Sequence, residues 1–177
     1  FSTSSQDGRA TGIAFNNDGT KMFLTGFDGD DVNEYTLSTG FDVSTASFVD
    51  SFSVSSQEDN PSDLAFNSDG TKMFVVGITG DDINEYTLST GFDVSTASYD
   101  SNFSVASQDT EPTGLTFSTD GKKMFVTGNG GNDVNEYTLS TGFDVSTASF
   151  VDSFDVSGQD NNPRAIAFNN DGTKMFI

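Results

Sequence analysis

Carboxylates are the only abundant side chains in this sequence that could carry chemistry. The chain has 27 acidic residues and neither cysteine nor histidine, which excludes thiol nucleophiles, imidazole bases and every Cys or His metal site. Paired carboxylates can serve as acid and base in glycoside hydrolysis, and carboxylate oxygens are ligands of Ca²⁺. However, 22 of the acids are Asp, a residue that bonds its own backbone in turns, so turn chemistry is the first interpretation.

The charge balance limits the partners. Seven basic residues leave a formal net charge of -20, and a field of that sign repels nucleic-acid phosphates and anionic lipids. No run of 18 apolar residues and no charged-then-apolar leader occurs. We therefore expect no nucleic-acid partner, no membrane insertion and no targeting signal within these residues.

The elements that must position the carboxylates recur along the chain. The segment DGTKMF, first found at residues 18–23, occurs four times at a spacing of 51 residues, once with a single change. A period of about this size is typical of solenoids, propellers and repeat arrays. The chain divides into residues 1–51, 52–102, 103–153 and a partial copy, 154–177.

Each copy contains four short runs rich in Phe, Val, Tyr and Thr, and none has apolar residues at helical spacing. In the first copy the runs are residues 12–15, 21–25, 32–37 and 47–54. The Asp-Gly pair between the first two runs predicts a tight hairpin, because Gly19 can adopt a positive φ. The sequence therefore predicts one four-stranded antiparallel unit in each copy.

The phenylalanines predict how these units pack. Of the 18 Phe, 15 fall at four repeat positions, those of Phe1, Phe15, Phe23 and Phe41. A four-stranded unit with aromatic side chains on both faces cannot stand alone, and radial stacking is the propeller solution. We predict an all-β fold, a single domain over residues 1–177 that forms a β-propeller half-ring.

The hairpin FNNDGTKMF followed by VNEYTLSTG resembles the four-stranded blade repeats of the YVTN, NHL and WD40-like propellers. The resemblance covers the whole chain and implies the fold, with little said about activity. The His and Trp signatures of true WD40 repeats are absent. The resemblance also implies that the chain is a fragment of a longer repeat protein.

The predicted strand order is a last strand, three complete units and then two first strands, so neither end completes a blade. Exposing three or four Phe on each open face costs on the order of 5 to 10 kcal/mol. We therefore expect a homodimer that closes through the open blade edges as an eight-bladed ring. The alternative is a fragment whose longer parent closes alone.

A candidate ligand face follows from the loops. Because antiparallel strands alternate direction, the second-to-third and fourth-to-first connections share one face of the ring. These are the connections that differ between copies, whereas NEYTLSTGFDVSTAS is identical in three copies. Variable loops on a rigid scaffold suit a ligand or partner, although unconstrained drift is the alternative. The candidates are Arg9, Phe27, Asp28, Asp30, Glu58, Asp63, Ile78, Glu111, Asn129 and Arg164.

Five aspartates are candidate calcium ligands. Three of them begin the third run of their copies, and two more lie just before the first of these: Asp31, Asp82 and Asp133, with Asp28 and Asp30. An Asp at such a place can instead cap its own turn, and FDGDD lacks the spacing of an EF-hand. We expect no cofactor, with Ca²⁺ as the alternative.

The leading functional hypothesis is a non-catalytic binding or adhesion module, extracellular or on the cell surface, that presents the loop face to a protein or glycan. The second is an enzyme, either a carboxylate-based glycoside hydrolase or a lactonase. The arginine clamp of sialidases cannot be built here, because the chain contains only Arg9 and Arg164. The third is a structural repeat of a surface or virion fibre. The expectation is that the protein is not an enzyme.

Overall fold

The computed structural model describes residues 1–177 and contains three four-stranded antiparallel sheets and one two-stranded sheet. The first sheet comprises β1 (Ala10–Phe15), β2 (Lys21–Gly26), β3 (Asp31–Leu37) and β4 (Ala46–Ser53). The second comprises β5 (Pro61–Phe66), β6 (Lys72–Gly77), β7 (Asp82–Leu88) and β8 (Ala97–Ser104). The third comprises β9 (Pro112–Phe117), β10 (Lys123–Gly128), β11 (Asp133–Leu139) and β12 (Ala148–Asp155), and the partial sheet comprises β13 (Ala167–Phe168) and β14 (Met175–Phe176).

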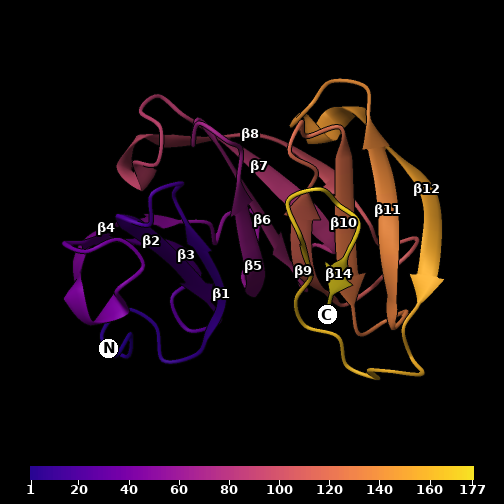
Figure 1. Cartoon of the computed structure of the whole chain (residues 1–177), viewed down its shortest axis with the longest axis horizontal. Coiled ribbons are helices and arrows are strands. Elements are labelled where there is room, and N and C mark those ends of the chain that lie inside the picture. Colours follow the sequence, from indigo (N-terminus) through magenta and orange to yellow (C-terminus); the bar gives the residue numbers. More distant parts are fainter.

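The sheets are the blades of a β-propeller arc, about three and a half in number, as the sequence predicted. Strands follow one another in chain order within each blade. The first strands lie toward the middle of the molecule and the last strands β4, β8 and β12 at its outer edge (Figure 1). The strand predicted at the start of the chain was wrong. Residues 1–9 contain turns and bends but no strand, and only two of them match the fourth strand of the other copies.

The recurring Asp-Gly turn has the predicted conformation. Gly19 has a φ of 71°, a value that most side chains resist. Asp18 Oδ1 accepts hydrogen bonds from the Thr20 amide at 3.0 Å and from the Thr20 hydroxyl. These bonds lower the pKa of Asp18. The turn is thus fixed by local hydrogen bonds in which the acid is structural.

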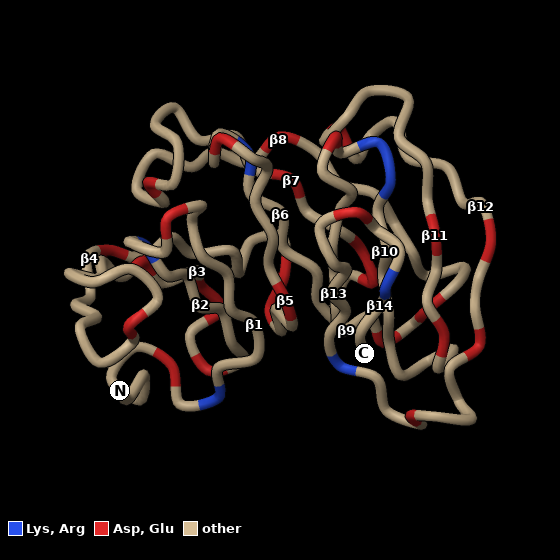
Figure 2. Tube along the Cα trace, viewed as in Figure 1, with Lys and Arg blue, Asp and Glu red and all other residues tan.

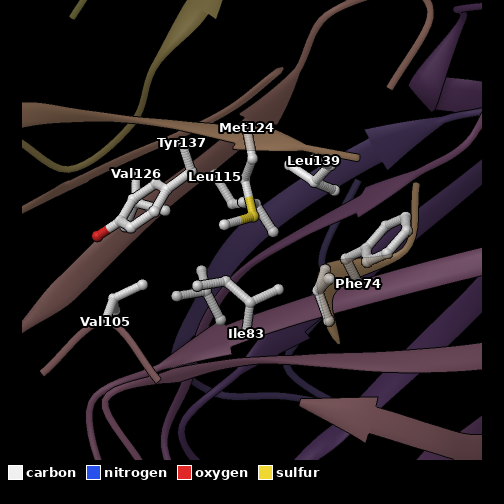
Figure 3. Packing of buried hydrophobic residues seen from close by; sticks show 10 residues of the cluster. Phe74, Ile83, Val105, Leu115, Met124, Val126, Tyr137 and Leu139 are labelled. Carbon is white, nitrogen blue, oxygen red and sulfur yellow. The ribbon is translucent and has the colours of Figure 1, made fainter. Parts of the chain in front are cut away.

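The core forms between blades, as the phenylalanine pattern indicated. Phe74, Ile83, Met124 and Tyr137 belong to one buried cluster that joins the second and third blades (Figure 3). Phe74 is 0% exposed, whereas Phe176, at the same repeat position in the partial blade, is 58% exposed. Phe23, in the first blade, is also 0% exposed, so burial of this position depends on having a complete blade after it.

Inner strands of adjacent blades are joined by side-chain hydroxyls. Thr11 Oγ1 donates to the Pro61 carbonyl at 2.9 Å, and Ser62 Oγ donates to the Pro112 carbonyl at 2.8 Å. Thr113 Oγ1 repeats the bond to the Pro163 carbonyl at 2.6 Å. Each bond crosses from one blade to the next in the same direction.

The connection between the third and fourth strands of each blade contains a 3₁₀ turn that the sequence analysis did not anticipate: η1 (Val43–Thr45), η2 (Val94–Thr96) and η3 (Val145–Thr147). Asp42 begins the first of these turns, and its Oδ1 accepts from the Ser44 amide at 3.1 Å. These three turns are the only helical segments, and none could span a bilayer.

Candidate functional site

The two variable sets of loops do meet at one end of the blades. In the second blade, Glu58 joins them: its carboxylate accepts from the Asn60 amide at 2.7 Å and from the Thr79 and Gly80 amides at 3.1 Å. Asp109 makes the same bridge in the third blade, to the Gly130 amide at 3.1 Å. The loop end is therefore held by buried carboxylates.

Glu58 is a correction to the candidate ligand face. Its side chain is 0% exposed, and its oxygens already bond backbone amides. It occupies the repeat position of Asp7 and Asp109, which are also buried. The signal was present in the 51-residue register, since an acid recurs at this position in every copy.

Two of the remaining candidates contact each other. The Arg9 guanidinium lies over the Phe27 ring, 5.0 Å from its centroid, which is a cation–π geometry. Asp28, Ile78, Glu111 and Arg164 are exposed at the loop ends, and Asn129 is half-buried. These residues lie at the same end of the blades, but they do not form a single cluster.

Asp30 has a structural role at this end. Its φ of 49° is left-handed, and this conformation allows its carbonyl to accept from the Val54 amide at 2.9 Å. Burial, and then the neighbouring acids Asp59, Asp7 and Glu58, raise the pKa of its side chain. Acidic residues lie along the whole chain and outnumber the basic ones (Figure 2).

The candidate calcium ligands are not clustered in this structure. No group of three or more acidic residues is placed to hold a metal ion. Asp31, Asp82 and Asp133 begin β3, β7 and β11 of three different blades. Each accepts a hydrogen bond from the asparagine two residues later. In the first blade, Asn33 Nδ2 donates to Asp31 Oδ1 at 2.6 Å. Asp28 and Asp30 lie in the turn before β3. The repeat therefore distributes these acids instead of gathering them.

Asp63 differs from every other candidate. It lies within the inner strand β5, not in the preceding loop as the sequence analysis placed it. The same repeat position holds Gly12, Gly114 and Ala165 in the other copies. Among otherwise similar blades, the second alone carries a titratable group at this place on its innermost strand.

The surroundings of Asp63 favour its protonated form. Its Oδ1 accepts from the Leu64 amide and its Oδ2 from the Leu115 amide of the next inner strand, both at 2.9 Å. Burial raises the pKa of Asp63 to about 7 and outweighs the opposing effect of these two bonds. A carboxyl that titrates near neutral pH can exchange protons with a substrate or water.

Asp63 should make stability depend on pH. Its folded-state pKa of about 7 exceeds the ordinary value of 3.8, so between these values the folded protein binds a proton that the unfolded chain does not. The free energy of unfolding should then fall as the pH rises from 4 to 7 and change little above 7. Over this pH range, the free energy of unfolding of the parent should fall by roughly 2 to 4 kcal/mol more than that of the Asp63→Ala variant.

Urea unfolding of both proteins at pH 4, 6 and 8 measures this difference. All other titrating groups are common to the two proteins and cancel. Alanine suits the backbone, since Ala165 occupies the same position in the partial blade. Parallel pH profiles for parent and variant would contradict the raised pKa.

Comparison with known proteins identifies a common fold. No protein-family model matches the sequence, and no curated protein is similar to it. A solved structure described as a "putative 6-phosphogluconolactonase" from Bacteroides uniformis is similar, with a TM-score of 0.66 and 13% identity over 94% of this chain and 46% of that one. A protein of the same description from Bacteroides fragilis gives a TM-score of 0.67 at 15% identity, with the same coverage of both chains.

A periplasmic gluconolactonase from Pseudomonas aeruginosa is also similar, with a TM-score of 0.60 and 18% identity, again over 94% of this chain and 46% of that one. The chain thus spans less than half the length of these proteins. At this identity the likeness shows the propeller fold.

These neighbours correct the leading functional hypothesis. The sequence analysis favoured a non-catalytic binding module and expected no enzyme, because the chain lacks the usual catalytic residues. The similar structures carry lactonase descriptions, which favour the lactonase alternative over the binding module.

Proposed function

We propose that this chain forms part of a propeller that hydrolyses a sugar lactone, with Asp63 as the general base. The proposal rests chiefly on Asp63: one inner-strand carboxyl with a pKa raised to about 7, at a position where the other copies have Gly or Ala. The descriptions of the structural neighbours supply the reaction class.

The reaction requires one carboxyl group that first accepts a proton and then donates it. The Asp63 carboxylate takes a proton from water while the water oxygen attacks the lactone carbonyl carbon. The tetrahedral intermediate then breaks its bond to the ring oxygen, which receives the proton from Asp63 and becomes a hydroxyl. The product is the open hydroxy acid. A base with a pKa near the working pH is suited to both proton transfers.

The charge of the chain favours an uncharged lactone over a phosphorylated one. A net charge of -20 opposes the approach of a phosphate. The two arginines, Arg9 and Arg164, are exposed at the ends of the blades that carry the variable loops. They could bind the hydroxyls or the developing carboxylate of the substrate.

Hydrolysis of glucono-1,5-lactone at pH 6.5, corrected for the spontaneous rate, tests this proposal. The Asp63→Asn variant should lower kcat/KM by about 100-fold or more. Asp50→Asn is the matched control, because Asp50 is exposed on the outer strand β4 and bonds only the Ser51 amide. The parent rate should rise with pH through about 7, as Asp63 loses its proton. Equal rates for parent and Asp63→Asn, or no rate above background, would refute the proposal.

Three further expectations remain part of the proposal. The first is that the chain belongs with the YVTN, NHL and WD40-like propellers, which its blade sequences resemble. A secreted location, outside the cell or at its surface, is compatible with the periplasmic neighbour. Dimerisation into an eight-bladed ring would give the chain the blades that its half-length leaves out.

A further inference from the structure

Adjacent blades are joined by the connection that carries the 3₁₀ turn. Phe92, in the second blade, packs against Phe66 with ring centroids 5.4 Å apart and against Phe23 of the first blade at 6.2 Å. Lys21 Nζ donates to the Phe92 carbonyl at 2.5 Å. Glu34 of the same ion pair accepts from the Val94 amide at 3.0 Å. A Phe-x-Val segment is thus held by a Lys–Glu pair of the preceding blade.

The next junction repeats this arrangement. Lys72 Nζ donates to the Phe143 carbonyl at 2.7 Å, and Glu85 accepts from the Val145 amide at 2.9 Å. The Val145 side chain is 0% exposed. Two independent junctions therefore show what a Lys–Glu pair at this position binds.

The third blade presents the same receptor as an open cavity of about 540 Å³. Its walls include Lys123, Phe125 and Glu136 from the third blade, together with Phe168 and the turn at residues 169–172. Lys123 and Glu136 form an ion pair of 2.6 Å, with side chains 51% and 29% exposed. In the second blade the equivalent side chains are 27% and 0% exposed. We name this cavity the third-blade socket.

The first blade presents the matching segment without a receptor. Phe41 is 62% exposed and Val43 42% exposed, whereas Val94 and Val145 are fully buried in the same connection of the other blades. The residues around them are letter-identical in all three copies. One end of the arc thus carries a socket, and the other end carries the segment that such a socket binds.

We propose that the third-blade socket binds the Phe41–Val43 segment of a second copy of this chain. Lys123 would donate to the Phe41 carbonyl, Glu136 would accept from the Val43 amide, and the Phe41 ring would lie between Phe125 and Phe168. The Lys–Glu pair and the two Phe rings of the socket are the same groups that bind the Phe-x-Val segment at the two internal junctions. The inference names the segments behind the dimerisation expected from the sequence, and it does not depend on lactone hydrolysis.

The turn contacts that the segment would leave and gain in this exchange are equivalent. In its own blade, Phe41 lies on the Gly19 turn, to whose carbonyl its amide donates at 3.0 Å. In the socket it would lie on the Gly172 turn. Residues 15–23 and 168–176 are letter-identical, FNNDGTKMF. The turn that the segment leaves and the turn that it meets therefore offer the same contacts, which is the usual basis of an exchange between copies.

A peptide with the sequence STGFDVSTAS, residues 38–47, tests the socket by calorimetric titration. The recipient is the 177-residue chain with Phe41→Ala, so that its own segment cannot compete. The peptide should bind one socket per chain, and Lys123→Met or Glu136→Gln should weaken binding at least tenfold. Lys122→Met is the matched control, because this neighbouring lysine lies outside the socket. Absence of saturable binding, or equal binding to all variants, would overturn the assignment.

Light scattering of the parent chain over a range of concentrations then tests the source of the segment. A dimer that dissociates on adding the peptide, and that the Phe41→Ala variant does not form, supports a second copy as the occupant. The second copy would be ruled out as the occupant if the parent stayed monomeric at every concentration while the Phe41→Ala variant still bound the peptide. That result would assign the socket to a following repeat within a longer chain.

Discussion

Replacing Phe74 by Ala should lower the free energy of unfolding by about 3 to 5 kcal/mol. The Phe74 side chain is 0% exposed. Its ring lies 4.5 Å from that of Phe117 and 6.3 Å from that of Phe143, centroid to centroid. Truncation removes apolar burial and leaves a cavity between two blades that are fixed by their own hydrogen bonds. Urea unfolding at neutral pH measures the loss.

Phe176→Ala is the control for this substitution, because Phe176 occupies the same repeat position in the partial blade and is 58% exposed. Its cost should stay below about 1 kcal/mol. The local sequence around the two residues is almost the same, so the difference isolates packing between blades. Similar costs for the two variants would mean that the phenylalanines act within blades and not between them.

Replacing Glu85 by Ala should cost about 2 to 4 kcal/mol, because breaking a buried ion pair leaves its partners without compensation. The Glu85 side chain is 0% exposed and pairs with Lys72. Its other oxygen accepts from the Val145 amide of the next blade. Burial raises the pKa of Glu85, against the opposing effect of the Lys72 hydrogen bond. The variant would leave a lysine and a buried amide without their acceptor.

Glu136→Ala makes the matched comparison for the ion pair. Glu136 forms the same pair with Lys123, but the two side chains are 29% and 51% exposed, and exposed ion pairs contribute little to stability. We expect a loss below about 1 kcal/mol in the same urea experiment. If both variants lost the same amount, the ion pair would contribute only within its own blade, and the proposed socket would lose its energetic basis.

Much of the fold could be predicted from the sequence because its signals are local and repeated. The Asp18–Gly19 turn depends on a positive φ and on bonds within three residues, so its identity is visible in the letters. The strands of each blade followed from the runs of Phe, Val, Tyr and Thr between such turns. The leading strand failed for the same reason: a pattern only two residues long cannot form a ladder.

The candidate site was harder to predict, because burial decides the role of an acid. Glu58 and Asp63 are five residues apart and were both assigned to a variable loop. The structure places Glu58 under three backbone amides and Asp63 on an inner strand, where burial raises its pKa. The residues around Asp63 in the sequence give no signal of β9, the distant strand whose Leu115 amide it binds.

The contacts between blades were invisible for a further reason. Glu34 meets Val94 and Lys21 meets Phe92, partners that lie 60 and 71 residues later in the chain. The identity of NEYTLSTGFDVSTAS in three copies was visible, but only the structure shows that this segment makes the junctions.

The hydroxyl bonds between inner strands have a consequence for how such a chain can change. Each joins a residue to the carbonyl 50 positions later, from Thr11 to Pro61, from Ser62 to Pro112 and from Thr113 to Pro163. Donor and acceptor therefore belong to neighbouring copies at all three junctions. Gain or loss of a 51-residue unit between these three donors, through recombination within the gene, would join a hydroxyl donor to an equivalent carbonyl. Blade number could then change without loss of these bonds, although a unit added after the fourth copy would meet Arg164 at the donor position.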